Sequence, residues 1–401
     1  MPNSPHICII GAGIVGLATG LQLLRARPGL RVSVIEKEDR VSAHQSGHNS
    51  GVIHSGVYYK PGSLRAVNCQ TGYRQLLAFA REHDLPHDIC GKVIVATRPE
   101  EVPQLRMILE RGIANGMKGL KMIGPEAIRE HEPHVRAVQG IWVPQAGIID
   151  YAQVARKYAE LIEQLNGAIF YRERVESIQV SDREVQLETN RNTHRADLLI
   201  NCAGLYSDRV AAMTGQQLDL QILPFRGEYY ELKPERAHLV NNLIYPVPDP
   251  NFPFLGVHFT RMIGGGIEAG PNAVLAFRRE GYDRFDVDRA ELWETLRYSG
   301  FQKLARKYWK TGLAEQYRSF SSAAFARALQ HLIPEIRRSD LVRGGAGVRA
   351  MACGPNGELL DDYVIYESNR VVNVCNAPSP AATSSLAIGQ TIVDRALRQF
   401  D

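Results

Sequence analysis

The amino-acid sequence predicts an α/β fold, and the strongest signs lie in its first forty residues. A short apolar run at His6–Ile10 leads directly into the glycine-rich turn GAGIVG at residues 11–16. The next segment, Leu17–Arg27, has helical spacing with three leucines on one side, and Arg31–Ile35 then alternates as a second strand. This strand–helix–strand order predicts two parallel strands joined by a helix.

The remaining chain alternates apolar, strand-like runs with segments of helical periodicity, without an internal repeat or a low-complexity linker. Strands are predicted at Lys92–Thr97, Glu184–Glu188, Leu198–Cys202, Gly227–Leu232, Val364–Tyr366 and Val371–Cys375. Helices are predicted at Gly62–His83, Pro103–Asn115, Tyr151–Gln164, Ser207–Met213, Arg289–Tyr308, Ser322–Leu332 and Ala382–Arg398. The proline-rich segment Tyr245–Pro253 is interpreted as an ordered turn, because strand-like aromatics flank it.

The composition is that of an ordinary globular protein. Of 401 residues, 44% are hydrophobic and 22% are charged, which excludes wholesale disorder. Lys and Arg number 47 against 43 Asp and Glu, and this net charge of +4 favours anionic ligands without indicating nucleic acid. The six cysteines form no CxxC motif, so a reduced, cytoplasmic setting is favoured. Neither a secretory signal nor an apolar run long enough to span a membrane is expected.

The glycine-rich turn matches a dinucleotide-binding fingerprint. Gly11 permits a tight turn, Gly13 lets a pyrophosphate approach the backbone, and Gly16 lets the helix pack closely on the strand. Glu36 closes the second strand and can accept hydrogen bonds from ribose hydroxyls. An acid at this position disfavours NADP but does not separate NAD from FAD. The alternative interpretation is a bare turn followed by a solvated acid.

Three later segments favour FAD, an extended cofactor whose reactive ring lies far from its adenine. The loop Ser46–Gly56 is dense in Gly, Ser and His, where an NAD dehydrogenase would continue with alternating strands and helices. The apolar run Leu198–Gly204 resembles the second dinucleotide-contact strand of flavoprotein oxidoreductases. The segment Asn373–Gln390 runs from a strand into a helix, whose first backbone amides can stabilise negative charge on a reduced flavin.

Five longer segments carry a more particular resemblance: HNSGVIHSGVYYKPGSLRA at 48–66, FPFLGVHFT at 252–260, GPNAVLAFRREGY at 270–282, GVRA at 347–350 and NAPSPAATSSLAI at 376–388. In these segments the chain resembles the flavin-dependent L-2-hydroxyglutarate dehydrogenases and oxidases. That group belongs to the D-amino-acid-oxidase-like class, with glycine and sarcosine oxidases and glycerol-3-phosphate dehydrogenases. The resemblance implies a fold that is α/β, and α+β overall. It implies a Rossmann-like FAD-binding domain built from a discontinuous chain, and an antiparallel-sheet substrate domain that caps the flavin.

The resemblance also implies a domain order and a set of cofactor contacts. FAD-binding segments are expected at residues 1–85, 147–215 and 341–401, and substrate-domain segments at 86–146 and 216–340. Val175 would contact the adenine through its backbone, the alternative being a simple core position. The residues expected to contact FAD are Gly11, Gly13, Ile14, Val15, Gly16, Glu36, Lys37, Ser46, Asn49, Ser50, Gly51, Val52, Val175, Ala203, Gly204, Pro380, Ala381, Ala382 and Thr383.

The reaction that the resemblance implies is oxidation of L-2-hydroxyglutarate, a dicarboxylate 2-hydroxy acid, to 2-oxoglutarate, with electrons passed to a quinone or to oxygen. Such a site needs a base for the hydroxyl proton and a ligand for each carboxylate. Two alternatives stay open: a flavin amine oxidase of the glycine/sarcosine oxidase type, and a glycerol-3-phosphate dehydrogenase-like enzyme. A flavoprotein that binds nucleic acid would need a concentrated basic face with stacking aromatics, and no nucleic-acid partner is expected.

Two histidines compete for the role of the base. His54 is the first choice, since it lies in the Gly/Ser loop beside the cofactor unit and a neutral imidazole accepts a proton near neutral pH. His258, in the strand-like run GVHFT, is the alternative. His44 and His48 are i,i+4 neighbours, but no nearby Asp, Glu or third His is expected to complete a site, so no metal is predicted.

The predicted carboxylate ligand is Arg349. It follows GGAGV in a stretch that resembles the one supplying a substrate-binding arginine in amino-acid-oxidase-like enzymes, and its planar guanidinium matches a carboxylate with two hydrogen bonds. The alternative is an ion pair with Asp361 or Asp362. Candidates for the distal carboxylate are Arg226 and Lys60, and candidate hydroxyl donors are Tyr58, Tyr59 and Tyr245.

A basic window at Arg297–Lys310 contains no acidic residue and has the pattern of an amphipathic helix. Phe301, Leu304, Ala305 and Tyr308 form an apolar stripe at helical spacing, with Trp309 beside it. One interpretation is an interfacial helix on an anionic membrane surface, which would make the protein peripheral on the cytoplasmic face of the inner membrane. In the alternatives, the stripe packs on the protein's own core or the charge steers a dianionic substrate.

Overall fold

A six-stranded sheet begins with the strand–helix–strand unit predicted at the N-terminus. The computed structural model describes residues 4–249 and 254–400. The strands of this sheet are β1 (His6–Ile10), β2 (Arg31–Ile35), β9 (Ala168–Phe170), β13 (Leu198–Asn201), β20 (Val364–Ser368) and β21 (Val371–Asn376). Their order is β20–β21–β13–β1–β2–β9, and only the β20–β21 pair is antiparallel. The parallel strands bring their carboxyl ends to one edge, where such sheets bind ligands.

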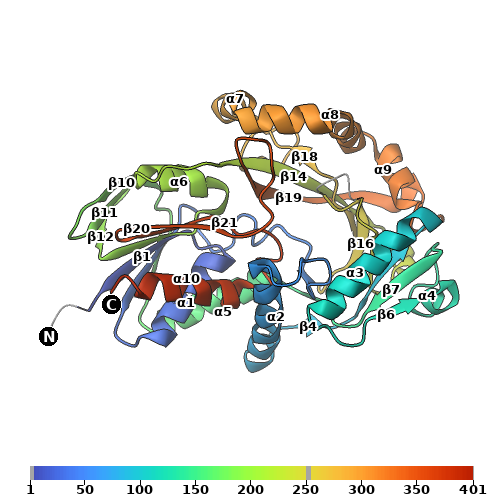
Figure 1. Ribbon diagram of the computed structural model, residues 1–401, viewed down its shortest axis with the longest axis horizontal. Coiled ribbons are helices and arrows are strands. Elements are labelled where there is room, and N and C mark those ends of the chain that lie inside the picture. The colour runs from blue at the N-terminus through green and yellow to red at the C-terminus, as the bar shows by residue number, and fades with distance from the viewer. Residues whose placement is uncertain (1–3, 250–253, 401) are drawn as a thin grey trace.

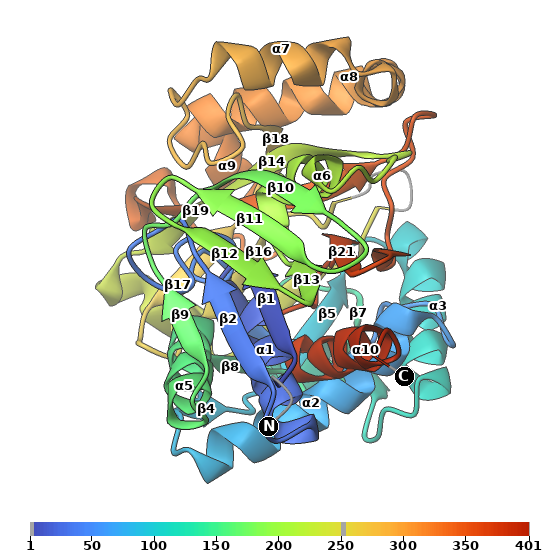
Figure 2. The same cartoon turned by 90° about the vertical axis from the view of Figure 1, so that its left-hand side faces the viewer.

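The two faces of this sheet are covered differently (Figures 1 and 2). Four helices cover one face: α1 (Ile14–Ala26), α2 (Leu64–Glu82), α5 (Tyr151–Gln164) and α10 (Ser385–Leu397). A three-stranded antiparallel sheet covers the other: β10 (Val175–Val180), β11 (Val185–Thr189) and β12 (Thr193–Ala196). Along β1, Ile7 and Ile9 pack against the helices while Cys8 and Ile10 pack against the small sheet, as the alternation of side chains along a strand requires.

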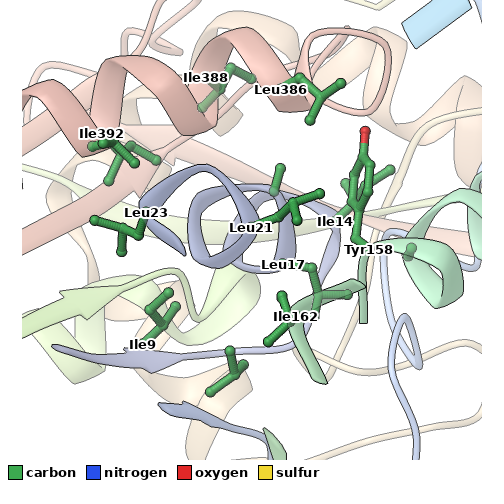
Figure 3. Packing of buried hydrophobic residues seen from close by; sticks show 14 of the residues in the cluster. Ile9, Ile14, Leu17, Leu21, Leu23, Tyr158, Ile162, Leu386, Ile388 and Ile392 are labelled. Carbon is green, nitrogen blue, oxygen red and sulfur yellow. The ribbon is translucent and has the colours of Figure 1, made fainter. Parts of the chain in front are cut away.

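The core beneath the first sheet is built around α1. Leu17 and Leu21 are fully buried, as their spacing predicts, and Figure 3 shows them among side chains of β1, α5 and α10. A Cβ on Gly389 of α10 would lie 2.9 Å from the Ala18 carbonyl carbon, so the two helices pack in direct backbone contact. This packing holds the N-terminus of α1 at the carboxyl edge of the sheet.

A second, nine-stranded sheet comes from other parts of the chain. Its strands are β5 (Lys92–Ala96), β6 (Lys121–Ile123), β7 (Gln139–Val143), β14 (Gln221–Leu232), β15 (Leu243–Pro246), β16 (His258–Arg261), β17 (Ile267–Gly270), β18 (Val274–Leu275) and β19 (Leu341–Cys353). The order is β18–β14–β17–β16–β15–β5–β7–β6, with β19 paired to β14. All pairs are antiparallel except β5 with β15. This is the antiparallel sheet that the resemblance implies.

Smaller elements join and cover the two sheets. A three-stranded sheet in the order β3–β8–β4 comprises β3 (Val52–Ile53), β4 (His87–Asp88) and β8 (Gly147–Ile149). The remaining α-helices are α3 (Val102–Ala114), α4 (Pro125–His131), α6 (Ser207–Met213), α7 (Arg289–Arg297), α8 (Ser299–Phe320) and α9 (Ser322–Leu329). Of the proline-rich segment predicted as a turn, residues 250–253 lie outside the described residues.

The structure differs from the predicted boundaries at three places. Residue 341 does not begin the last segment of the first sheet, because β19 pairs with β14 along its length and so belongs to the second sheet. The single helix predicted at Arg289–Tyr308 is two helices, since Tyr298 adopts an extended conformation (ψ 124°) that ends α7. The last helix begins at Ser385 rather than Ala382.

The lipid-facing interpretation of the apolar stripe at Arg297–Lys310 is also wrong. Leu304 is buried with Leu223 and Cys353, and Phe301 and Tyr308 pack against the same cluster, so the stripe covers the protein's own core. The outer surface of α7 and α8 exposes a different set of apolar side chains: Trp293, Leu296, Trp309, Leu313, Tyr317 and Phe320. In the described part of the chain, no helix combines the length and apolar character needed to cross a membrane.

Candidate active site

A cavity of about 1610 Å³ lies between the two large sheets, and both contribute to its wall. The first sheet contributes the turn after β1, the end of β2 and the loops that follow β13 and β21. The second sheet contributes side chains from β14, β15, β16 and β19. The volume exceeds the roughly 300–1,000 Å³ of ordinary small-molecule pockets, and so leaves room for an extended cofactor together with a substrate.

The three glycines of the N-terminal turn have different reasons to be glycine. Gly11 adopts φ +102°, and a Cβ there would lie 2.6 Å from the Cys202 carbonyl oxygen. A Cβ on Gly16 would lie 2.1 Å from the Gly11 carbonyl oxygen. Gly13 lines the cavity, and its Cβ would meet only the Ser46 hydroxyl, at 3.4 Å. The protein's own packing therefore requires Gly11 and Gly16, whereas the open space at Gly13 belongs to the cavity.

Glu36 is fixed at the edge of the cavity by backbone amides. Its Oε2 accepts a hydrogen bond from Ala12 N at 2.7 Å, and its Oε1 accepts one from Glu38 N at 2.9 Å. These bonds tie the end of β2 to the glycine turn. The carboxylate lines the cavity with its remaining acceptor capacity available to a ligand hydroxyl.

The loop after β2 is held by its own short polar side chains. Ser46 Oγ accepts a hydrogen bond from Ile14 N at 2.9 Å, at the start of α1. Asn49 Nδ2 donates to Ser46 O at 2.7 Å, and Asn49 Oδ1 accepts from Gly51 N at 2.9 Å. A Cβ on Gly51, which has φ +66°, would lie 2.8 Å from the Ile149 carbonyl oxygen. Gly51, like Gly16, lies in the protein's own packing and not on the cavity wall.

The other residues predicted to contact FAD line the cavity, and one of them also reaches the predicted base. Thr383 Oγ1 accepts a hydrogen bond from His54 N at 3.1 Å and lies 2.6 Å from the Tyr151 hydroxyl. The loop before α10 therefore fixes the backbone of His54. The remaining predicted FAD-contact residues on the wall are Ile14, Val15, Lys37, Ser50, Val52, Val175, Ala203, Gly204, Pro380, Ala381 and Ala382.

His54 and His258 both line the cavity, His54 from the loop after β3 and His258 from β16. Burial and then the nearby Lys92 ammonium lower the pKa of His54 to about 3. Burial lowers the pKa of His258 to about 3 as well. Nδ1 of His258 lies 2.9 Å from Gly256 O, a geometry that places a proton on Nδ1 and leaves Nε2 as the acceptor in the neutral ring. Both imidazoles are therefore neutral, as a proton acceptor must be.

Arg349 reaches the cavity from β19, where it lies opposite Phe225 of β14. Among the described residues it has no carboxylate partner, and the alternative pairing with Asp361 or Asp362 is not formed: Asp362 accepts instead from Arg65 N at 3.0 Å. Burial raises the pKa of the neighbouring Tyr229 to about 12, and the Arg349 charge opposes that rise. A guanidinium without a counter-charge on a cavity wall is suited to an anionic ligand.

A family model described as FAD dependent oxidoreductase matches residues 6–395. The chain belongs to this family of FAD-dependent oxidoreductases. The cavity fits the cofactor that the family description names, because the open approach at Gly13 and the start of α1 lie at one part of the wall and the loop before α10 at another.

Individual proteins extend this comparison. The chain is 56% identical to L-2-hydroxyglutarate dehydrogenase of Indibacter alkaliphilus, over 98% of this chain and 99% of that protein. It is 43% identical to the mitochondrial L-2-hydroxyglutarate dehydrogenase of Homo sapiens, over 100% of this chain and 90% of that protein. Its fold is similar to that of L-alpha-glycerophosphate oxidase from Mycoplasma pneumoniae with FAD bound, with a TM-score of 0.78 at 22% identity and coverage of 99% and 94%.

Three predicted substrate residues of this FAD-dependent oxidoreductase do not reach the cavity. Arg226 bonds Glu228 Oε1 through Nε at 3.1 Å and Nη2 at 3.0 Å, so its charge is already paired. Lys60 is exposed. Tyr59 is buried beneath Arg65, whose guanidinium lies 4.4 Å from the ring centroid. Tyr245, by contrast, lines the cavity as predicted.

The prediction that no acid lies near His44 is wrong. Nε2 of His44 lies 2.9 Å from Glu38 Oε1 and 3.0 Å from Glu280 Oε1. The Lys37 ammonium bonds both carboxylates, at 3.1 Å from Glu38 and in direct contact with Glu280. The Lys37 ammonium already bonds both acids, and we assign no metal to this cluster.

Three residues at the site were not among the predicted ones. Tyr229 and Arg65 line the cavity, and Lys92 is buried directly behind Tyr245. Tyr229 lies within a predicted strand close to the Arg349-bearing strand, and Arg65 lies in the segment PGSLRA, so sequence signals existed for both. For Lys92, the first residue of an apolar run, the sequence carries no such signal.

Proposed function

We propose that this oxidoreductase oxidises L-2-hydroxyglutarate to 2-oxoglutarate. The observation that carries the proposal is identity of 56% and 43%, over nearly whole chains, with proteins named L-2-hydroxyglutarate dehydrogenase. FAD, when bound, supplies the acceptor for the hydride that leaves the substrate Cα. The side chains of the cavity bind the substrate and take its hydroxyl proton.

The proposed cofactor site uses both the turn and the loops. Gly13 and the N-terminus of α1 would hold the pyrophosphate, because backbone amides and the helix dipole there favour negative charge. Glu36 accepts from the ribose hydroxyls, and Val175 lies at the adenine end. Ala381, Ala382 and Thr383 flank the flavin end. This arrangement is supported because all of these residues line the same cavity.

Arg349 binds the C1 carboxylate of the substrate with two hydrogen bonds. Its place on β19, a strand paired along the whole length of β14, gives the guanidinium a rigid support. The lack of a carboxylate partner among the described residues supports this role, since the half-buried guanidinium lies on the cavity wall with no counter-charge from the protein. Binding at C1 directs the adjacent Cα–H toward the flavin end of the cavity.

His54 takes the hydroxyl proton at its imidazole. Its neutral state and its fixed backbone, bonded to Thr383, support this role. His258 is the second candidate, because its Nε2 is an acceptor and its ring packs on Tyr245 with centroids 4.0 Å apart.

We also propose how the chain divides into domains. FAD-binding segments are residues 1–85, 147–215 and 354–401, and substrate-domain segments are 86–146 and 216–353. The strand composition of the two large sheets supports this division, with β19 assigned to the substrate domain.

We propose that the electron acceptor is a quinone or oxygen. If it is a membrane quinone, we propose that the outer face of α7 and α8 binds an anionic membrane surface. The enzyme would then lie on the cytoplasmic side of the inner membrane. Trp309, Leu313 and Tyr317 are each more than half exposed on α8. Lys310 lies 5.7 Å from the Trp309 ring centroid, so cation and aromatic ring are adjacent. Aromatic and basic side chains together suit a headgroup region.

Anaerobic mixing of the purified enzyme with L-2-hydroxyglutarate tests the reaction. We expect loss of the oxidised flavin absorbance and formation of one 2-oxoglutarate per flavin. Bleaching by glycine or sarcosine but not by L-2-hydroxyglutarate would show an amine oxidase instead.

Reoxidation with a soluble quinone, compared with oxygen, identifies the acceptor. Flotation with anionic vesicles at low salt tests the membrane surface, comparing wild type with W309S/L313S/K310E. Equal recovery of the two proteins with the vesicles would contradict the α7–α8 surface.

A further inference from the structure

Lys92 is a buried cation that the roles assigned above do not use. It is the first residue of β5, and only 1% of its surface is exposed. Within residues 4–249 and 254–400, its ammonium makes neither an ion pair nor a hydrogen bond to another side chain. Buried lysines are ordinarily paired, because an uncompensated charge away from water costs several kcal/mol. Lys92 is therefore a charge for which the described protein supplies no counter-charge.

Two aromatic rings lie against the ammonium, and one of them lines the substrate cavity. Nζ lies 4.9 Å from the ring centroid of Tyr58 and 4.5 Å from that of Tyr245. Tyr245 lines the cavity and packs on His258. The rings stabilise an ammonium through their negative faces but carry no net charge. The positive charge thus lies one ring away from the cavity wall.

The titratable groups facing Lys92 come from four elements, and each is neutral or cationic at pH 7. The loop after β3 contributes His54 and Tyr58, α2 contributes Cys69, β15 contributes Tyr245, and β16 contributes His258. Burial raises the pKa of Cys69 to about 12 and raises the pKa values of both tyrosines. Burial lowers the pKa of Lys92 to about 7.

We propose that Lys92 is a specificity-determining residue: its ammonium supplies the positive charge that favours the distal carboxylate of a dicarboxylate substrate, while Arg349 binds the C1 carboxylate. This inference rests on the proposed function. It gives the distal carboxylate a cation that neither Arg226, paired with Glu228, nor the exposed Lys60 provides. Across one ring in a water-poor site, the attraction between the two charges is much stronger than in water.

A proton is linked to this binding. The distal carboxylate favours the protonated form of Lys92, so dicarboxylate binding is strong below the lowered pKa of the amine, about 7, and weakens as the pH rises through it. A monocarboxylate of the same length gains nothing from the ammonium. The ratio of the dicarboxylate affinity to the monocarboxylate affinity therefore measures the contribution of Lys92. Effects of pH on the flavin or on Arg349 change both affinities and cancel in the ratio.

The substitution K92M in the FAD-loaded enzyme tests the proposal with two substrates, L-2-hydroxyglutarate and L-2-hydroxypentanoate. They have the same carbon chain and differ in the distal carboxylate. We expect kcat/KM for L-2-hydroxyglutarate to fall about 100-fold and that for L-2-hydroxypentanoate to change less than about threefold. K121M makes the same change at an exposed lysine of β6 and is expected to change neither value. An equal fall for both substrates, or no fall for either, overturns the proposal.

A measurement on the wild-type enzyme does not depend on how the variant folds. Dissociation constants of glutarate and pentanoate are measured from the perturbation of flavin absorbance between about pH 6.5 and pH 9. We expect the preference for glutarate to fall as the pH rises through about 7, and a preference that is constant with pH contradicts the role of Lys92. If L-2-hydroxyglutarate fails to reduce the wild-type flavin, the proposed function fails. If it reduces the flavin but K92M keeps the substrate preference, only the Lys92 inference fails.

Discussion

The two ends of the cavity differ in how their polar groups are satisfied. At the cofactor end, Glu36, Ser46 and Asn49 are already hydrogen-bonded to backbone groups of the protein. At the substrate end, Arg349 and Lys92 are cations without carboxylate partners among the described residues. The first end is rigid before any ligand arrives, and the second is electrostatically incomplete until an anion binds. We therefore expect the substrate to supply the negative charge that these two side-chain cations lack.

The largest expected effect comes from a substitution at the cofactor end of the cavity. In Gly13→Val the side chain occupies the space through which the pyrophosphate approaches, so we expect the purified protein to lack FAD and all activity. The flavin-to-protein absorbance ratio measures this. Gly312→Val on α8, where a Cβ has open space, is the control and should keep its flavin. A yellow, active Gly13→Val protein would show that the cofactor lies elsewhere.

The next effect distinguishes the two histidines at the substrate end. His54→Ala should slow flavin reduction by ~10²–10⁴-fold while FAD content stays normal, because the hydroxyl proton loses its acceptor. Stopped-flow absorbance under anaerobic conditions measures the rate. Should His258→Ala cause this loss and His54→Ala cause none, the roles of the two residues are exchanged.

Arg349→Lys tests the carboxylate ligand at the substrate end. An ammonium cannot form the two parallel hydrogen bonds of a guanidinium, so we expect KM for L-2-hydroxyglutarate to rise by about 100-fold. Steady-state kinetics with saturating acceptor measure it. Arg343→Lys makes the same change at an exposed position of β19 and should leave KM unchanged. An unchanged KM in Arg349→Lys would place the carboxylate on another residue.

The smallest expected effect comes from a second substitution at the cofactor end of the cavity. Asn49→Ala removes the hydrogen bonds to Ser46 O and from Gly51 N, which hold the loop and touch no substrate. We expect about a fivefold weaker retention of FAD, corresponding to about 1 kcal/mol, with an unchanged KM. Flavin fluorescence after dilution measures the dissociation. A changed KM with normal FAD retention would mean that the two ends are coupled through this loop.

The sequence predicts the cofactor end better than the substrate end because the former is local in the chain. The turn at 11–16 and Glu36 lie within one strand–helix–strand unit, so their spacing carries the information. The prediction that Arg226 binds the distal carboxylate fails because its partner Glu228, two residues along the same strand, lies on the same face and pairs with it. Lys92 contacts Tyr245, which lies on the neighbouring strand of the sheet but far away in sequence, and no local pattern reports that contact. The break at Tyr298 likewise depends on packing beneath α8.

The alternation of the chain between the two sheets has a consequence for biosynthesis. β1 is made long before β21 (Val371–Asn376), yet its sheet is complete only when β21 has paired with β13, and α10 follows β21 along the chain. Until α10 packs on α1, the apolar residues of α1 that face it lack their cover. During translation this surface is a target for chaperones and a hazard for aggregation. FAD loading is therefore expected only after α10 has left the ribosome and packed on α1, which makes the bound flavin a marker that this sheet and its helices have folded.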